Sequence, residues 1–339
     1  MFYQVILSLQ VVALYKTNMK RIVLCCIGLL LPLLCLAALT GAPELYFYNV
    51  TGVNTISQSN VKAICEDSYG FMWFGTKNGL NRYDGYRFRE FDVQDTDKHC
   101  GNNNVSVLFE DLDKKLWVGT DKGVYRFDPV KEKFVFIDLL AQDSVYMNDW
   151  VSAIESDKNG RIWIVIPNQG VFRYDQQAHR LQHYPFRDKS RKPERDESTP
   201  QSLCIRANGE VWIGSNRMGL FKYDSEKDSF SQWIVDAYGN TVQGENIYTL
   251  CEYGDALVMG VHEGMLKKWD LNANRISVFD TPQIHYKIIR CVKCFDRRNL
   301  LVATQDGLYV VNERDKSVHH YFEDDLNPYG LSDNNIFTI

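Results

Sequence analysis

The chain has 339 residues, of which 45% are apolar and 24% are charged, so it encodes a folded protein of about two domains rather than a disordered or fibrous one. Lysine and arginine total 38 against 43 acidic residues, which gives a formal net charge of −5. Because nucleic-acid binding needs clustered basic residues, this mildly acidic chain without a basic block is not expected to contact nucleic acid.

Residues 1–43 are predicted to be an export segment. Lys20 and Arg21 precede a run without any charge, residues 22–42, which matches the basic and apolar regions of a signal peptide, and Met19 is the more natural start. The apolar run is also near the length of a membrane span, so a cleaved signal and a signal anchor both stay open. In either case we expect the body of the protein to be exported.

From residue 44 onward the sequence repeats itself. An apolar run recurs every 43–49 residues around one large side chain, and a glycine and a Tyr-Arg-Tyr-Asp-like run follow it. The large side chains are Trp73, Trp117, Trp163, Trp212, Val258 and Leu301, and the glycines are Gly79, Gly123, Gly170, Gly219, Gly264 and Gly307. Each unit holds four short strand-like runs separated by turns rich in Asp, Asn and Gly. This repeated pattern predicts an all-β fold, a β-propeller of four-stranded antiparallel blades.

The repeat predicts six complete blades plus the start of a seventh. Residues 330–339 open a seventh unit and stop after its first strand, and residues 46–50 resemble the last strand of a blade. In a closed ring this N-terminal strand would complete the last blade and remove an exposed sheet edge. The two middle strands of that blade are missing, so we expect an incomplete ring over residues 44–339, truncated in blade seven.

The recurring aromatic and acidic residues have a structural interpretation. A blade is too thin to fold alone, so Trp73, Trp117, Trp163 and Trp212 are predicted to pack between neighbouring blades. A platform of stacked tryptophans for sugars is the alternative, but a binding site would not need a copy in every blade. An aspartate ends the third strand of five units, where a turn cap is expected: Asp84, Asp128, Asp175, Asp224 and Asp270.

No catalytic, metal or cofactor site is expected. The seven histidines are dispersed, and neither a nucleophile motif nor a His-Glu-x-x-His motif occurs. Cys291 and Cys294 have zinc-like spacing without a second pair, so buried thiols or an occasional disulfide are the preferred interpretations of the body's cysteines. Residues 187–197 are a mixed-charge insertion, interpreted as a loop, with partner docking as the alternative.

Residues 60–85 carry the signature Asn-Val-x-x-Ile-x-Glu-Asp-x-x-Gly-Phe-x-Trp-Phe-Gly-Thr-x-x-Gly-Leu-Asn-Arg-Tyr-Asp-Gly, which closely resembles the two-component regulator propeller repeat. The resemblance implies the periplasmic sensor region of a hybrid two-component system, tethered to the inner membrane and homodimeric in its full-length form, with an oligosaccharide as the ligand. The family also has a second propeller, a histidine kinase and a receiver, and this sequence shows none of their motifs. Signalling chemistry is therefore expected to reside outside these residues.

Propeller geometry predicts which residues could hold a ligand. Connections between blades and turns between second and third strands share one face, where ligands usually bind. The candidates on that face are Lys77, Lys122, Tyr146, Trp150, Arg217, Tyr238, His262 and Tyr286. A non-enzymatic sensor is the first hypothesis, an interaction or structural propeller is the second, and a secreted propeller glycoside hydrolase is the third.

Overall fold

The computed structural model describes residues 45–339 apart from 49, 51–53, 96, 99 and 187–198. The chain divides after Leu45, and Tyr46–Ile339 form one compact unit. The predicted export segment and the mixed-charge insertion lie outside the described residues. The helices of the described ranges are single 3-10 turns, and none of them is long and apolar enough to cross a membrane.

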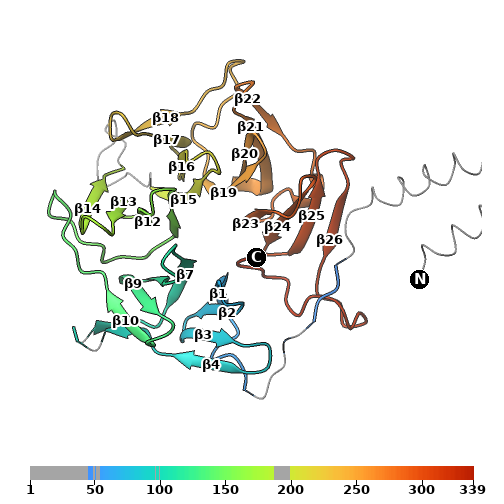
Figure 1. The fold of residues 1–339 in the computed structure, drawn as a ribbon. Coiled ribbons are helices and arrows are strands. Elements are labelled where there is room, and N and C mark those ends of the chain that lie inside the picture. Colours follow the sequence, from blue (N-terminus) through green and yellow to red (C-terminus); the bar gives the residue numbers. More distant parts are fainter. Residues whose placement is uncertain (1–44, 49, 51–53, 96, 99, 187–198) are drawn as a thin grey trace, which may run out of the picture. The chain divides into compact units, whose positions relative to one another are not determined.

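Six four-stranded antiparallel sheets follow one another along the chain, each with its strands in sequence order (Figure 1). Blades 1 to 3 comprise β1 (Val61–Glu66), β2 (Met72–Thr76), β3 (Gly79–Tyr83) and β4 (Phe88–Phe91); β7 (Val105–Glu110), β8 (Leu116–Thr120), β9 (Gly123–Asp128) and β10 (Lys133–Phe136); and β11 (Ala153–Ser156), β12 (Ile162–Ile166), β13 (Gly170–Asp175) and β14 (Arg180–Tyr184). Blades 4 to 6 comprise β15 (Pro200–Ile205), β16 (Val211–Ser215), β17 (Leu220–Asp224) and β18 (Ser229–Trp233); β19 (Ile247–Tyr253), β20 (Ala256–Val261), β21 (Met265–Asp270) and β22 (Arg275–Val278); and β23 (Ile289–Cys294), β24 (Asn299–Thr304), β25 (Gly307–Asn312) and β26 (Val318–Tyr321). The predicted β-propeller fold is confirmed.

Three kinds of short element lie in the connections. A two-stranded hairpin of β5 (Gln94–Asp95) and β6 (Cys100–Gly101) joins blades 1 and 2. The 3-10 turns are η3 (His262–Gly264), between β20 and β21, and η4 (Pro282–Ile284), between blades 5 and 6. Single β-bridges, Leu140 with Tyr146 and Val235 with Thr241, form tighter hairpins in two further connections.

The first strands of successive blades contact one another and surround a central channel. Five apolar clusters fill the five interfaces between neighbouring blades. Trp73, Trp117, Trp163 and Trp212 are fully buried in four of these clusters. In the fifth, between blades 5 and 6, Val258 packs with Val292 and Tyr309 instead.

An aspartate in the turn before the tryptophan strand holds each of the first three tryptophans. Asp111 is 5% exposed, and its carboxylate accepts the Trp117 indole N–H at 2.8 Å and the backbone N–H groups of Asp113 and Lys115. Asp67 and Asp157 bind Trp73 and Trp163 in the same way. The same carboxylate thus satisfies a tight turn and a buried indole, which fixes the turn to the interface between blades.

The predicted turn chemistry is confirmed. The carboxylate of Asp84 accepts the backbone N–H groups two and three residues later, and Asp128, Asp175, Asp224 and Asp270 do the same in their blades. The six recurring glycines all have positive φ, between +72° and +123°. At Gly264 a Cβ atom would lie 2.0 Å from the Ile284 carbonyl oxygen, so only glycine fits there.

Both ends of the unit differ in detail from the expectation. Residues 46–50 were expected to form a strand, but the described ones are not in one; Phe47 N–H donates to the Tyr329 carbonyl at 3.0 Å. Residues 333–339 are likewise not a regular strand. The Ile336 N–H donates to the Thr304 carbonyl oxygen, as the Val151 N–H does to the Thr120 carbonyl oxygen. Residues 337–339 line the channel. This segment therefore lies where the innermost strand of a seventh blade would be.

Candidate functional site

Strand direction defines two faces of the propeller. We call the end that carries the connections between blades and the turns between second and third strands the upper face, and the opposite end the lower face. All eight ligand candidates are exposed. Lys77, Lys122, Arg217 and His262 occupy upper-face turns of blades 1, 2, 4 and 5, and Tyr286 lies in the connection from blade 5 to blade 6.

Tyr146 and Trp150 gather beside one upper-face turn of blade 3. The Gln169 side chain donates to the Tyr146 carbonyl oxygen at 2.8 Å, and the Asn168 side chain donates to Asp149, the neighbour of Trp150, at 2.9 Å. The two rings are 48% and 40% exposed, so they remain accessible to a ligand.

Tyr238 lies away from the expected face. Its connection forms a hairpin that runs down the outside of blade 5, because the Asp236 carboxylate accepts the Ile276 N–H and Ala237 N–H donates to the Asn274 carbonyl. Asn274 belongs to the lower-face turn between β21 and β22, and the Arg275 guanidinium lies 5.4 Å from the Tyr238 ring centroid. The structure therefore separates Tyr238 from the other candidates.

Arg217 and His262 line one hollow, which we call the upper hollow. It has a volume of about 380 Å³ and is lined by Arg217, Gly244, Glu245, Asn246, His262 and Met265. The connection between blades 4 and 5 is bonded to both neighbouring turns: Arg217 N–H donates to Glu245 O at 2.9 Å, and His262 N–H donates to Asn246 O at 3.2 Å. This backbone pairing fixes the two predicted side chains on either side of Glu245 and Asn246.

The upper hollow offers hydrogen-bond acceptors that the protein leaves unused. Glu245 forms an ion pair with the largely buried Lys267 through one carboxylate oxygen, while its Oε2 atom and the Oδ1 atom of Asn246 are buried without a partner. A buried polar atom without a hydrogen-bond partner costs free energy, so these two oxygens are suited to accept hydrogen bonds from the hydroxyl groups of a ligand. The exposed imidazole of His262 adds a group that donates or accepts at the same place.

Tyr248 joins the upper hollow to the central channel. Its hydroxyl accepts from the Asn246 side chain at 3.3 Å, its ring centroid lies 6.5 Å from that of His262, and it also lines the channel. Glu245, Asn246 and Tyr248 were not among the residues predicted from the sequence. The available signal was a departure from the repeat, because Tyr248 stands where the first two blades have Lys62 and Ser106.

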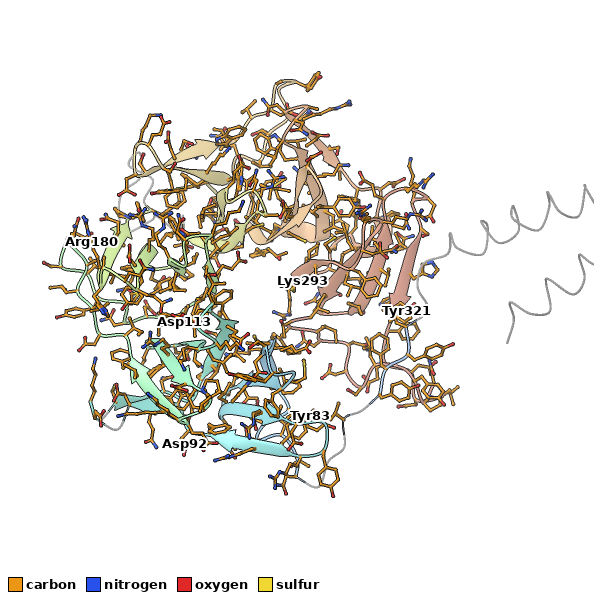
Figure 2. The ribbon with its side chains drawn as sticks, viewed as in Figure 1. Tyr83, Asp92, Asp113, Arg180, Lys293 and Tyr321 are labelled. Atoms are coloured by element: carbon orange, nitrogen blue, oxygen red, sulfur yellow. The ribbon has the colours of Figure 1, made fainter. Side chains whose placement is uncertain are left out.

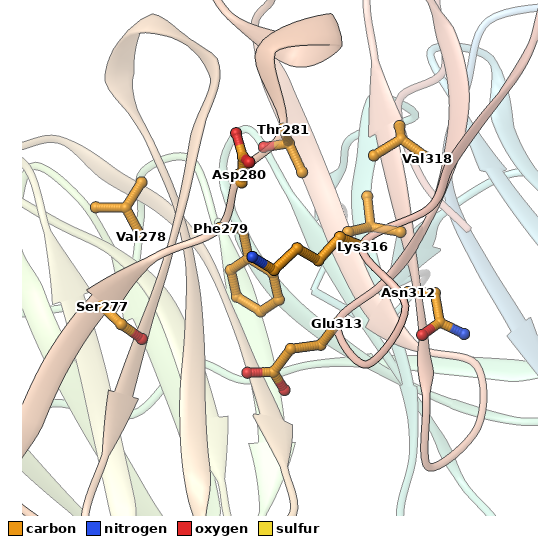
Figure 3. Close-up of a pocket in the computed structure, with 10 residues that line it drawn as sticks. Ser277, Val278, Phe279, Asp280, Thr281, Asn312, Glu313, Lys316 and Val318 are labelled. Atoms are coloured by element: carbon orange, nitrogen blue, oxygen red, sulfur yellow. The ribbon is translucent and has the colours of Figure 1, made fainter.

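Another hollow, of about 270 Å³, lies between blades 5 and 6 and is lined by the end of β22, the connection that follows it and the turn between β25 and β26 (Figure 3). Phe279, Val311 and Val318 contribute its apolar lining, and Thr281 contributes a hydroxyl that is buried without a partner. None of the ligand candidates lines it, so it lies apart from the upper hollow.

The described cysteines are free thiols. Burial raises the pKa of both Cys65 and Cys251 to about 11, so these thiols stay protonated at neutral pH. Within the described ranges, no group of three or more His, Cys, Asp or Glu side chains is arranged to hold a metal ion.

Consecutive four-stranded meanders around a channel define the class of protein as a β-propeller. Within it, residues 55–78 match the model of the family described as two-component regulator propeller. No curated protein matches the chain.

Solved structures with this fold include extracellular domains of bacterial signalling proteins. The extracellular domain of the putative hybrid two-component system BT3049 from B. thetaiotaomicron is similar with a TM-score of 0.68 and 20% identity, over 86% of this chain and 39% of that one. The extracellular domain of the putative one-component system BT4673 from the same organism gives 0.66 and 19%, over 87% and 36%. PorZ, a surface component of the type-IX secretion system of Porphyromonas gingivalis, gives 0.61 and 18%, over 85% and 44%. The chain spans less than half the length of each, and at these identities the likeness shows the fold.

Proposed function

We propose that this chain is the extracytoplasmic sensing part of a two-component signalling system, which binds a glycan-derived ligand in the upper hollow without catalysing a reaction on it. The family match at residues 55–78 and the fold shared with extracellular domains of putative signalling proteins support the signalling role. The predicted export segment supports a periplasmic location, tethered to the inner membrane in the full-length form. The histidine kinase that receives the signal would lie outside these 339 residues.

The observation that carries the proposal is the composition of the upper hollow. Unused carboxylate and amide oxygens of Glu245 and Asn246 lie beside the donors of Arg217 and His262, with the Tyr248 ring next to them. Alternating donors and acceptors beside an aromatic ring suit a polyhydroxylated ring, and few precisely placed polar groups are typical of specific ligand sites.

Binding there would act on two blades at once, because Arg217 belongs to the turn of blade 4 and His262 to that of blade 5. A ligand that contacts both favours one spacing of the blades. The ligand can bias a kinase only by the difference between its affinities for the two spacings of the blades.

Titration calorimetry of the full chain with cellotriose, xylotriose and trigalacturonate tests the proposal. We expect at least one of these probes to bind, and Arg217→Ala to weaken that binding about tenfold, the loss of one good charge-assisted hydrogen bond. Arg314→Ala is the matched control, since it removes an exposed arginine from a lower-face turn. Absence of binding by all three probes, or equal binding by the Arg217→Ala variant, would contradict the proposal.

A further inference from the structure

The first strand of the blades begins with a shared irregularity. The pairing of the first strand with the second shifts between Val61 and Ala63 in blade 1, and blades 2, 4, 5 and 6 shift at the equivalent place. Such a bulge leaves one residue unpaired and redirects its side chain. The residues at the shifts are Lys62, Ser106, Gln201, Tyr248 and Arg290, and all of them line the central channel.

Ser152 and Phe337 line the channel at the corresponding positions of blade 3 and of the segment 336–339. We call these seven residues the channel mouth, because they lie near the upper-face ends of the first strands. The channel mouth is strongly asymmetric. Tyr248, Arg290, Phe337 and Lys62 follow one another along one arc, and the other arc holds only the hydroxyls of Ser106 and Ser152 and the Gln201 amide.

The two cations of the channel mouth are held by neutral groups. The Arg290 guanidinium lies 4.5 Å from the Phe337 ring centroid, and its Nε donates to the Asn335 side chain at 3.2 Å. Lys62 Nζ donates to the Asn104 side chain at 3.0 Å. A ring face and two amides thus hold the two cations without an ion pair, and the Asn104 amide in turn donates to the Asp121 carboxylate.

Many partly buried cations of the described residues form ion pairs, among them Lys267 with Glu245, Lys268 with Glu313 and Arg206 with Glu210. Within the same ranges Arg82, which lies over the Phe71 ring, and Arg126, which donates to the Gln176 side chain, form no ion pair, so Lys62 and Arg290 share this feature with them. No carboxylate of the described residues forms an ion pair with Lys62 or Arg290, although the chain is acidic overall.

Deeper in the channel the charge is also positive. Lys293 lines it and lies at the edge of the central opening in Figure 2. Glu155 is the only acidic side chain among the described channel-lining residues, and it accepts the Ile205 N–H at 2.8 Å. Burial raises the pKa of Glu155 to about 7, so near neutral pH it is only partly ionised and neutralises little of this charge. Low-dielectric walls then concentrate the positive potential at the channel mouth.

We propose that the channel mouth binds an anionic group, a carboxylate or a sulfate, carried by the ligand whose neutral part occupies the upper hollow. Tyr248, which borders both places, would connect them. The ligand class is therefore an acidic saccharide. This inference rests on the proposed function for the neutral part of the ligand, whereas anion binding at the channel mouth stands on Lys62 and Arg290 alone.

Calorimetric titration of the full chain with D-galacturonate, D-galactose and inorganic sulfate tests this inference. The two sugars have the same ring and differ in the carboxylate at C6, and sulfate probes the anion alone. We expect D-galacturonate to bind at least about tenfold more tightly than D-galactose, with a preference that falls as salt rises. We expect sulfate to bind in the millimolar range and to compete with D-galacturonate.

The double variant Lys62→Gln/Arg290→Gln should abolish sulfate binding and remove the preference for D-galacturonate. Its matched control is Lys131→Gln/Arg297→Gln, which removes one lysine and one arginine from exposed lower-face turns. Equal losses in both variants would mean that net charge alone is responsible and would overturn the inference, as would undetectable sulfate binding. A circular dichroism melt of both variants checks that the folded state is retained.

The outcomes separate the two proposals. Binding of D-galactose as tightly as D-galacturonate would overturn the acidic ligand and leave the upper hollow standing. Binding of sulfate and D-galacturonate that depends on Lys62 and Arg290 and not on Arg217 would support the channel mouth and contradict the upper hollow as part of the site.

Discussion

Blades 1 to 3 and blades 4 to 6 use the same repeat differently. In the first three blades an aspartate binds the buried tryptophan at 2.7 to 2.9 Å. In blade 4 Glu210 takes that place, 3.4 Å from the Trp212 indole nitrogen, and pairs with Arg206 and Lys222. Blades 5 and 6 have Val258 and Leu301 in place of the tryptophan. The upper hollow lies in this less regular half, as do Tyr248 and Arg290 of the channel mouth. Regular copies thus supply stability, and departures from the repeat such as Tyr248 contribute to the candidate site.

The largest effect that would test this division is expected from Trp117→Ala. Trp117 is fully buried between blades 2 and 3, and its ring centroid lies 5.8 Å from that of Tyr174. The cavity should lower the free energy of unfolding by about 3–5 kcal/mol. Val258→Ala, at the same place in blade 5, should cost less because fewer atoms are removed. Denaturant unfolding measures both, and equal losses would break the comparison.

A smaller effect is expected from Asp111→Ala. The change leaves the buried Trp117 indole N–H and two backbone N–H groups without an acceptor, so a loss of about 1–3 kcal/mol is expected. Asp84→Ala serves as the control, because the Asp84 cap is exposed to water that replaces the lost bonds. Thermal melts that shift equally for both variants would show that the buried carboxylate has no special role.

The sequence predicts those parts of the structure that recur from one copy of the repeat to the next. The tryptophans, turn glycines and capping aspartates recur in register, so each copy supports the others and the blades could be predicted closely. The site could be predicted only in part. Arg217 and His262 follow from the position of the turns, and the fold brings them beside Glu245 and Asn246. Asn246 has the same place in the repeat as Asn60 and Asn104, so nothing in the sequence distinguished it, and Tyr248 is a single departure from the repeat. Tyr238 was misplaced for a related reason: the bridge between Val235 and Thr241 folds its connection downwards, and nothing in the repeat specifies how connections fold.

The Glu155→Gln variant tests how the stability of the protein depends on pH through this channel-lining carboxyl group. The folded-state pKa of Glu155 is raised, by burial first, from 4.5 to about 7, so the folded state holds this proton more tightly than the unfolded chain does. Stability that is present below about pH 4.5 is therefore lost as pH rises to about 7. The glutamine variant lacks this loss and should be more stable than the wild type near pH 8, by on the order of 2 kcal/mol.

Urea unfolding of both proteins at several pH values between 4 and 8 measures the difference, in which the contributions of the other groups cancel. Two curves with the same pH dependence would show that Glu155 titrates normally in the folded protein.

The smallest stability effect is expected in the upper hollow. The His262 side chain is exposed, and its neighbour Tyr248 is itself held by Asn246. His262→Ala should change the free energy of unfolding by no more than about 0.5 kcal/mol, as is usual for surface substitutions. A calorimetric melt measures the effect. An unchanged melting temperature would support the difference between the two halves, and a large loss of stability would place His262 among the structural residues.

Hydrogen–deuterium exchange of the full chain with and without trigalacturonate tests most directly whether the less regular half holds the ligand. We expect added protection at residues 216–219, 244–248 and 262–265 and at the start of β23, with blades 1 to 3 unchanged away from Lys62. Protection confined to the upper-face turns of blades 1 to 3, or to the hollow between blades 5 and 6, would contradict a site built from the upper hollow and the channel mouth.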